Sequence, residues 1–389
     1  MGIHPIIYIR TDGNAKIASG HLVRCFSIAL ACRALKMKVH FLVSDKESRL
    51  LLEGIVGSNA GFTITQLETA AYDFLERELP EVLSLLSPHT CSPSVPSDCT
   101  PFAPQKPIFL LDSYYVTEKY LSSLRPYAKT AYLDDLRLFD YPVDLIINYD
   151  VIPDDKMESY KSAYQNAGQL LLGASYTPLR DQFRNQHTSV REKASDILIT
   201  SGGSDSLHFC LRLVSQIANA FRPDNLTWPP SMAVLANMNF HVVIGRLNED
   251  KEQLYRLAKD FSFLTLHENV QDMAALMVKC DLAVSAAGTT LYELCALGIP
   301  AISFVMADNQ LDCAYAFDAA NTIPCAGDLR TSADEVFKNI LHYIADASAP
   351  SENSYLQRVA VHDRMVKLVD KDGSARIAHA LLSLCSHKK

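Results

Sequence analysis

The chain has 389 residues, of which 48% are hydrophobic and 21% charged, a composition typical of globular rather than disordered proteins. Its formal net charge of -8 at pH 7 argues against a protein that binds nucleic acid through a general basic surface. One domain usually spans about 100 to 200 residues, so the length suits two. We therefore expect two globular lobes without a nucleic-acid partner, in which local groups hold any anionic ligand.

The sequence shows no export or membrane signal. The N-terminal stretch MGIHPIIYIRTDG lacks the basic start of a signal peptide, and its apolar run has only the length of a strand. The longest apolar window, residues 281–306, is interrupted by polar residues, glycine and proline, whereas a membrane span needs about 20 mostly apolar residues. Ten cysteines show neither CxxC pairs nor zinc-ligand spacing. These features predict a cytoplasmic protein with reduced thiols and no membrane partner.

Short apolar runs alternate with amphipathic stretches along the chain, which is the pattern of βαβ units on a parallel sheet. In the first half the pattern predicts strands over 6–9, 39–43, 108–112 and 131–135, and a helix over 22–35. In the second half it predicts strands over 196–203, 238–245, 263–269, 281–288 and 300–306, and a helix over 207–221. The predicted fold class is α/β, with two Rossmann-like domains built on parallel sheets.

Polar segments indicate where the domains end. We expect an N-terminal domain over 1–180, a C-terminal domain over 190–350, and a helical segment over 351–389 that packs back on the first domain. That last segment has a break at Asp372-Gly373. Residues 87–107 are rich in proline, serine and threonine, which favours an exposed insertion.

The stretch SGHLVR after the first strand predicts a helix start that carries His21. Gly20 lets the backbone approach a ligand, and a helix N-terminus favours a neutral histidine that accepts a proton. The alternative is that His21 caps or packs and that Arg24 is a surface charge. For Arg24 the sequence also leaves open whether it balances phosphate charge or ties the loop to Asp112 or Asp134.

Two loops of the second half are typical of anion sites. SGGSD at 201–205 can hold phosphate oxygens through backbone and hydroxyl donors, although an ordinary tight turn explains it equally well. SAAGTTLYE at 285–293 opens a helix whose N–H groups can bind a diphosphate, with Glu293 placed to accept hydrogen bonds from a ribose. The alternative is a capping box between Thr290 and Glu293. P-loop and GxGxxG signatures are absent from the sequence.

Other polar residues follow the expected strands. Asp112 and Tyr114 in LLDSYY, and Asp134-Asp135 in YLDDL, fall where parallel strands end, which is the edge that carries ligands in open α/β sheets. Paired carboxylates can act as acid or base groups, but they more often cap helices and form turns.

In their order along the chain, the segments RTDGNAKIASGHLVRC, LLDSYYV, YLDDL, ILITSGGSD, HENVQDMAALM and AAGTTLYELCALGIPAISFVMADNQ resemble the UDP-sugar hydrolases of the pseudaminic acid pathway. The resemblance spans about residues 6 to 325. The last segment is also similar to glycosyltransferases of the two-lobe GT-B fold, including the enzyme that adds N-acetylglucosamine to lipid-linked muramyl peptide.

This resemblance implies a GT-B fold and hydrolysis of UDP-2,4-diacetamido-2,4,6-trideoxy-β-L-altropyranose to UDP and free sugar, with inversion and without metal or other cofactor. The implied catalytic residues are His21 as general base, Tyr114 and Asn309. The expected substrate-binding residues are Arg10, Asp12, Gly20, Arg24, Asp112, Gly202, Gly203, Ser204, Asn269, Met273, Ala287, Gly288, Thr289, Thr290, Glu293 and Gln310. We expect a monomer whose partner is the nucleotide sugar.

The chain departs from the family pattern at the 87–107 insertion and after Asn309-Gln310, where TIPCAGDL lacks the expected glycine. The sugar's stereochemistry therefore does not follow from the motifs. The alternatives are a GT-B glycosyltransferase that uses a UDP-amino sugar, a non-catalytic nucleotide-sugar binding protein, and a mutase or epimerase.

Overall fold

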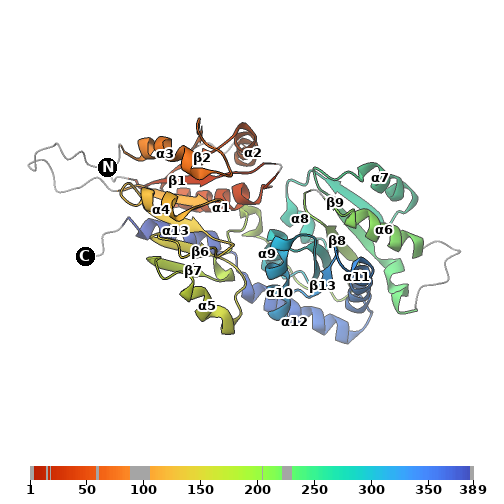
Figure 1. The fold of residues 1–389 in the computed structure, drawn as a ribbon. Coiled ribbons are helices and arrows are strands. Elements are labelled where there is room, and N and C mark those ends of the chain that lie inside the picture. Colours follow the sequence, from red (N-terminus) through yellow and green to blue (C-terminus); the bar gives the residue numbers. More distant parts are fainter. Residues whose placement is uncertain are drawn as a thin grey trace, which may run out of the picture. The chain divides into compact units, whose positions relative to one another are not determined.

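The structure is a computed structural model that describes residues 4–14, 16–17, 19–57, 61–87, 106–203, 205–220 and 230–385. The chain divides into two compact units, of which the first contains Met1–Arg180 and Asp372–Lys389 and the second Asp181–Lys371 (Figure 1). Most of the expected insertion at 87–107, and Ser204 among the expected site residues, lie outside the described residues.

The first unit is built on a parallel sheet with the strand order β3-β2-β1-β4-β5-β6-β7. Its strands are β1 (Ile6–Thr11), β2 (Lys38–Val43), β3 (Phe62–Gln66), β4 (Ile108–Asp112), β5 (Lys129–Leu133), β6 (Leu145–Asn148) and β7 (Gln169–Leu172). Most strands are almost fully buried, which explains why their sequences are continuous apolar runs rather than alternating ones.

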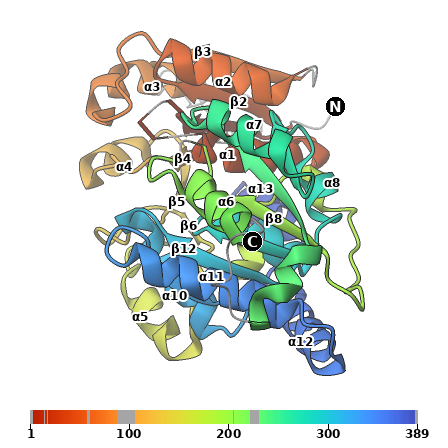
Figure 2. The same cartoon turned by 90° about the vertical axis from the view of Figure 1, so that its right-hand side faces the viewer.

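Helices of the first unit cover both faces of this sheet. They are α1 (Gly20–Ala34), α2 (Lys46–Val56), α3 (Leu79–Leu86), α4 (Glu118–Leu124), α5 (Met157–Ser162) and α13 (Gly373–Ser383), with short 3-10 turns η1 (Leu75–Glu78), η3 (Asp154–Lys156) and η4 (Ala174–Tyr176). α1 packs against α2 and α13. On the other face, α3 and α4 pack on Tyr8, Phe109 and Tyr132 in one core cluster. Figures 1 and 2 both show α2 and α3 at the β2-β3 end of the sheet.

The second unit carries a parallel sheet with the order β10-β9-β8-β11-β12-β13. Its strands are β8 (Asp196–Thr200), β9 (Asn239–Ile244), β10 (Leu264–Glu268), β11 (Leu282–Ala286), β12 (Ala301–Val305) and β13 (Cys325–Asp328). Every strand that the sequence predicts in the two halves is present, and the α/β fold class with two parallel-sheet domains is confirmed.

The helices of the second unit also form two layers. They are α6 (Phe209–Ala220), α7 (Lys251–Asp260), α8 (Met273–Met277), α9 (Thr289–Leu297), α10 (Leu311–Ala319), α11 (Ala333–Ala347) and α12 (Glu352–Leu368), with 3-10 turns η5 (Asp181–Phe183), η6 (Pro230–Asn237) and η7 (Asp308–Gln310). One face packs on α6, α7 and α11 through a large apolar cluster. α9 packs against α8 and α12. The described part of the expected C-terminal segment, residues 351–385, contains two helices, of which α12 belongs to the second unit and α13 to the first.

In each sheet the chain reverses its direction of strand addition at one place, between β1 and β4 in the first unit and between β8 and β11 in the second. Open α/β sheets bind ligands outside the carboxyl ends of their strands at such switch points. The loops that leave β1, β4, β8 and β11 are therefore where each unit is expected to hold a ligand.

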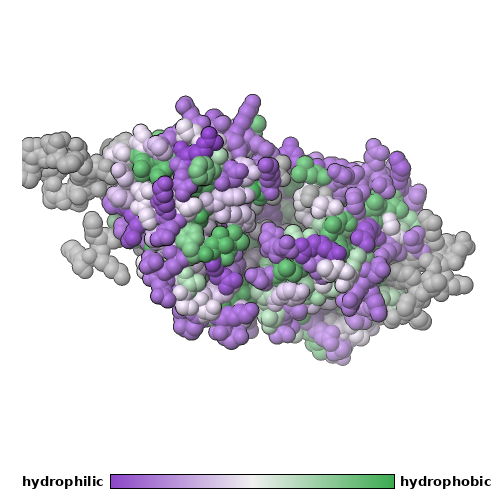
Figure 3. Space-filling view, viewed as in Figure 1, coloured by the Kyte–Doolittle hydropathy of each residue, from purple (hydrophilic) through white to green (hydrophobic). Residues whose placement is uncertain are grey.

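Hydrophilic side chains predominate on the face drawn in Figure 3, and apolar ones gather in small groups. Within the described residues, none of the helices combines the length and apolar character required to cross a bilayer.

Candidate functional site

The switch point of the first unit brings together a histidine and an aspartate. His21 is in the first turn of α1, directly after β1, and Asp112 is the last residue of β4, the strand beside β1. The Nδ1 atom of His21 lies 2.6 Å from Oδ1 of Asp112. Both side chains are buried, with 5% of His21 and 1% of Asp112 exposed. A short charge-assisted contact of this kind fixes the orientation of the imidazole ring.

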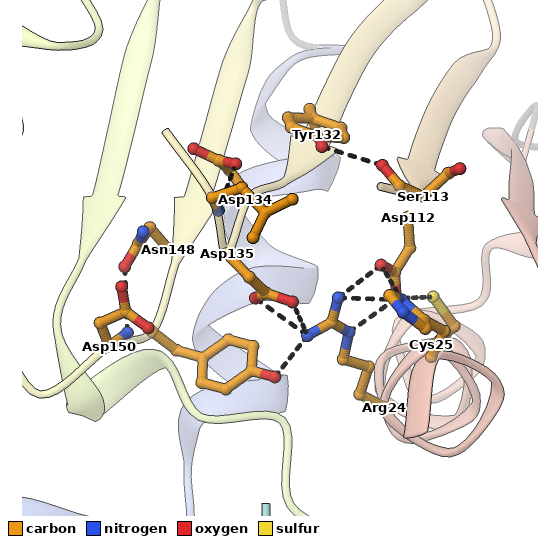
Figure 4. A network of polar contacts seen from close by, with 12 residues as sticks. Arg24, Cys25, Asp112, Ser113, Tyr132, Asp134, Asp135, Asn148 and Asp150 are labelled. Carbon is orange, nitrogen blue, oxygen red and sulfur yellow. Dashed lines mark hydrogen bonds and ion pairs between the residues drawn. The ribbon is translucent and has the colours of Figure 1, made fainter. Parts of the chain in front are cut away.

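Arg24, one turn further along α1, completes this pair. Its Nε donates to Oδ2 of Asp112 at 2.7 Å and its Nη2 donates to Oδ1 at 2.5 Å, so the guanidinium grips the carboxylate with two parallel hydrogen bonds (Figure 4). Burial by itself would raise the pKa of Asp112, but Arg24 and then His21 outweigh it and hold the pKa far below its usual range. Asp112 is therefore a permanent carboxylate beside the histidine.

Geometry indicates which ring nitrogen of His21 carries the proton. Nδ1 faces the Asp112 carboxylate at 2.6 Å, and two bare acceptors at that separation would repel each other. A proton on Nδ1 that is donated to Asp112 removes the repulsion. Nε2 of a neutral His21 is then the nitrogen with a lone pair, which is the state a general base requires.

The outer side of Arg24 has partners on two further strands of the sheet. Nη1 donates to Asp135, at 2.7 Å from Oδ2, and to the hydroxyl of Tyr149 at 2.6 Å. Asp135 follows β5 and Tyr149 follows β6. One of the alternatives for Arg24 was a contact with Asp112 or Asp134. In the structure Arg24 contacts Asp112, and its second carboxylate partner is Asp135 rather than Asp134. Arg24 is thus held within the cluster by Asp112, Asp135 and Tyr149.

Tyr114 lies against the histidine. Its ring meets the His21 ring edge to face, with centroids 4.5 Å apart and an interplanar angle of 77°. Burial first, and then the neighbouring Asp135 carboxylate, which hydrogen-bonds to the phenol, raise the pKa of Tyr114 above its ordinary value. Tyr114 is therefore a neutral phenol that donates its O–H to Asp135 and whose oxygen can accept a hydrogen bond beside His21.

The two adjacent aspartates after β5 have different environments. Asp134 turns inward, where its carboxylate accepts from the hydroxyl groups of Tyr141 at 3.0 Å and Tyr164 at 2.7 Å and from backbone N–H groups of its own turn. Asp135 turns toward Arg24, and its side chain is 21% exposed (Figure 4). Asp134 thus has the structural role of a turn former. The sequence analysis selected Asp134 and Asp135 as a pair but did not distinguish their roles. It did not select Tyr149, although the segment LIINYD also lies at the end of a strand.

Two expected substrate-binding residues of the first unit form a separate buried ion cluster. Arg10 lies two residues after Tyr8 on β1 and so faces the α3-α4 side of the sheet, where it is 0% exposed. Its guanidinium donates to Glu78 at 2.7 and 2.8 Å and to Asp12 at 2.5 Å. In this structure Arg10 faces these two carboxylates, and its expected contact with the substrate stays a prediction. Asp12 is also buried, since it pairs with Arg10 and accepts from the backbone N–H of Ser44.

The diglycine turn of the second unit follows β8 at its switch point. Gly202 has φ +88, a conformation that favours glycine, while a Cβ at either Gly202 or Gly203 would meet nothing within 4 Å. By contrast, a Cβ at Gly245, after β9, would lie 2.3 Å from the carbonyl oxygen of Gly203. The turn is therefore packed on the end of β9, and the space above Gly203 is open.

α9 begins on the other side of this switch point, after β11. Its start is not the capping box between Thr290 and Glu293 that the sequence left open. Gly288 is the N-cap residue, and within residues 285–297 of the described chain no side chain caps the helix. Thr289 is exposed and Thr290 half-buried, so their hydroxyl groups and the first N–H groups of α9 are available to an anion. Ala287 is buried, and its backbone N–H donates to the carbonyl oxygen of Phe304 on the neighbouring β12, while Glu293 is 8% exposed.

The remaining expected residues of the second unit lie on neighbouring loops at the carboxyl edge of its sheet. Asn269 is exposed, with φ 50, after β10, and Met273 begins α8. Asn309 is exposed within η7, after β12. Gln310 instead turns back to the protein, where its Oε1 accepts from the backbone N–H of Met306 at 2.8 Å. Gln310 therefore shapes the loop that presents Asn309.

Two parallel α/β units with these strand orders match solved structures of the GT-B fold over nearly the whole chain. MurG of Acinetobacter baumannii superposes with a TM-score of 0.60 at 12% identity, covering 97% of this chain and 99% of that one. The Streptomyces glycosyltransferase SsfS6, solved with thymidine diphosphate, gives 0.57 at 14% identity over 98% and 100% of the two chains. Spinosyn rhamnosyltransferase SpnG, also with thymidine diphosphate, gives 0.58 at 14% identity over 97% and 100%. The protein has a GT-B fold.

Two curated proteins are similar to the chain in sequence. One is an uncharacterized protein of Methanocaldococcus jannaschii, 22% identical over 324 residues, which are 79% of this chain and 57% of the relative. The other is the spore coat polysaccharide biosynthesis protein SpsG of Bacillus subtilis, 23% identical over 221 residues, 57% of this chain and 58% of the relative. The chain thus spans less than three fifths of the length of either relative. No family model matches the chain.

Proposed function

We propose that the protein is a hydrolase that cleaves the anomeric C–O bond of a UDP-linked diacetamido-trideoxy sugar and releases UDP and the free sugar with inversion. Its products would serve the biosynthesis of a nonulosonic acid such as pseudaminic acid for surface glycans. The GT-B fold and the similarity to SpsG, a polysaccharide biosynthesis protein, support a role in nucleotide-sugar chemistry.

The observation that carries the proposal is the short contact between Nδ1 of His21 and Asp112 at the switch point of the first unit. It leaves Nε2 as the basic nitrogen, and a positioned base of this kind typically contributes about 10²- to 10⁴-fold to a rate. In the proposed reaction His21 takes a proton from water, the oxygen of that water bonds to the anomeric carbon, and UDP departs with the electron pair of the breaking bond. Tyr114, beside the imidazole, would hold the sugar or the water.

The charges around His21 suit the sugar end of the substrate rather than its phosphates. Arg24 is paired with two carboxylates, Asp112 and Asp135, so with a neutral His21 the cluster carries one net negative charge. Such a cluster repels an anion, while it stabilises the positive charge that develops on a sugar ring as its glycosidic bond breaks.

The diphosphate is proposed to bind the second unit. Its support is the open space above Gly203 and the uncapped N-terminus of α9, whose N–H groups and dipole favour an anion. Glu293 would accept from the ribose hydroxyl groups, and Asn309 would contact the sugar-phosphate. This assignment requires no metal ion, because the helix N-terminus supplies the positive potential.

A second candidate is a GT-B glycosyltransferase in which a hydroxyl group of an acceptor takes the place of water. The observation in its favour is that the similar solved structures include named glycosyltransferases. The same His21-Asp112 pair would then remove a proton from the acceptor.

Incubation with a panel of UDP-amino sugars in the absence of acceptor separates the two candidates. The release of UDP and the configuration of the sugar are followed by ³¹P and ¹H NMR. UDP formed together with free sugar of inverted anomeric configuration supports hydrolysis. Intact UDP-sugar that is consumed only after an acceptor is added supports transfer, and isomerised sugar without UDP release contradicts both candidates.

A further inference from the structure

Two groups compete for the Nδ1 atom of His21. Oδ1 of Asp112 lies 2.6 Å away and accepts a proton from Nδ1, whereas Nη2 of Arg24 lies 3.0 Å away and could only donate one to it. A neutral imidazole has one N–H and one bare nitrogen, so the two contacts demand opposite tautomers. Which group satisfies Nδ1 decides whether Nε2 is a base or a donor.

The other end of the Arg24 guanidinium is anchored, which sets the direction in which its N–H groups point. Nη1 contacts both oxygens of Asp135, at 3.0 and 2.7 Å, and the hydroxyl of Tyr149 at 2.6 Å. With Nη1 held there, the planar guanidinium presents Nε and Nη2 to the two oxygens of Asp112. Nη2 thus donates one of its two hydrogen atoms to Oδ1 of Asp112, while the nitrogen itself stays within 3.0 Å of Nδ1 of His21.

We propose that Asp135 is a positioning residue that fixes the tautomer of His21 through Arg24. Asp135 anchors Arg24, Arg24 then donates to Asp112, and Asp112 accepts the proton of Nδ1, which leaves Nε2 bare. Without the Asp135 carboxylate, Arg24 rotates and donates to Nδ1, and the imidazole proton moves to Nε2. Nothing in this chain of contacts requires Asp135 to touch a substrate.

The consequence for catalysis rests on the proposed role of His21 as a base. A histidine with its proton on Nε2 cannot accept one from water at that atom, so the Asp135→Asn enzyme would lose turnover in proportion to the shifted population. UDP binding, which is assigned to the second unit, would be unchanged.

The tautomer is measured directly, without substrate, by two-bond ¹H–¹⁵N correlation spectra of the full-length protein labelled at histidine. Spectra are recorded at about pH 8, where imidazole is mostly neutral, and the His21 signal is assigned by its disappearance in His21→Asn. In the wild type the expected tautomer has its proton on Nδ1. In Asp135→Asn we expect most His21 side chains to carry the proton on Nε2. Tyr149→Phe removes only one partner of Nη1, so there we expect a smaller fraction of His21 with the proton on Nε2.

Asp155→Asn is the matched control, because Asp155 is an exposed aspartate of η3 in the same unit. It should leave the His21 signal as in the wild type. Proton on Nδ1 in both folded Asp135→Asn and Tyr149→Phe, or proton on Nε2 already in the wild type, would overturn the inference. A shifted tautomer in a protein whose wild type releases no UDP from any substrate would keep the inference and refute the proposed hydrolase.

Discussion

His21 and Asp112 are separated by 91 positions in the sequence, yet their side chains meet at 2.6 Å. They meet because β4, which ends in Asp112, pairs directly with β1, the strand that leads into the helix of His21. The order of strands in the first sheet, rather than any local motif, therefore creates the pair on which the proposed chemistry depends.

Replacing His21 with asparagine tests the base. Asn keeps a polar side chain near Asp112 but cannot accept a proton at neutral pH, so we expect turnover to fall by at least about 100-fold. UDP affinity measured by calorimetry should stay almost the same, because the diphosphate is assigned to the second unit. Near-normal turnover in a folded His21→Asn protein would exclude His21 as the base.

Replacing Asp112 with asparagine tests the buried charge pair. Arg24 would lose its two-bond carboxylate partner, and breaking such a pair typically costs about 3–5 kcal/mol of the free energy of unfolding. The native pKa of Asp112 lies below its unfolded value of about 4, so its stabilising contribution is present above that pH and is lost as the pH falls below it.

Urea unfolding between about pH 2 and pH 5 measures this effect. The wild type should lose more stability than Asp112→Asn as the pH falls through that window. Equal pH dependence of the two proteins would mean that Asp112 is not held as a carboxylate by Arg24.

Substitution by alanine at two glycines of the second unit should affect different properties, namely stability at Gly245 and UDP affinity at Gly203. Gly245→Ala would push a Cβ into the carbonyl oxygens of Gly203 and Gly202, at 2.3 and 2.4 Å, and overpacking of this kind typically costs about 1–3 kcal/mol. Gly203→Ala has open space, so its melting temperature should match the wild type, while its UDP affinity should fall if a phosphate lies there. Unchanged UDP affinity in Gly203→Ala would remove that residue from the proposed site.

Asp150, which follows β6, should change the free energy of unfolding with pH in the direction opposite to Asp112. Burial, and then the nearby Asp135, raise the pKa of Asp150 to about 6. The native carboxyl group therefore binds a proton more readily than the unfolded one, with its pKa of about 4, and its stabilising contribution is lost as the pH rises through about 6. Between about pH 4 and pH 7 the stability of the wild type should fall relative to that of Asp150→Asn. A constant difference between the two proteins would contradict the raised pKa.

The apolar runs of the sequence were sufficient to predict the fold class and the main strands, because parallel strands buried on both faces leave continuous hydrophobic segments. β3, β6, β7 and β13 were not predicted. β6, β7 and β13 have four residues each, fewer than any strand that was predicted, and most residues of β3 are partly exposed, so these sequences give little apolar signal. The missed strands lie toward the edges of the sheets, away from the switch points.

The site was predictable as a set of loops but not as a set of contacts. His21 and Asp112 could be found separately because His21 follows one predicted strand and Asp112 ends another. The pairing of Arg24 with Asp135 and Tyr149, and the burial of Arg10 against Glu78, depend on strand order and on which way each side chain faces. A strand one residue longer or shorter reverses that facing, so a sequence without structure does not determine it.

The return of α13 to the first unit also sets an order of assembly during synthesis. Gly373 fits so closely against Thr177 that a Cβ there would lie 2.1 Å from its carbonyl oxygen, and α13 then covers α1. A ribosome makes residues 181–371 between these two pieces, so the helix that carries His21 lacks its cover until the second unit has emerged. The nascent first unit therefore lacks the helix that covers α1 until residues 373–383 have been synthesised.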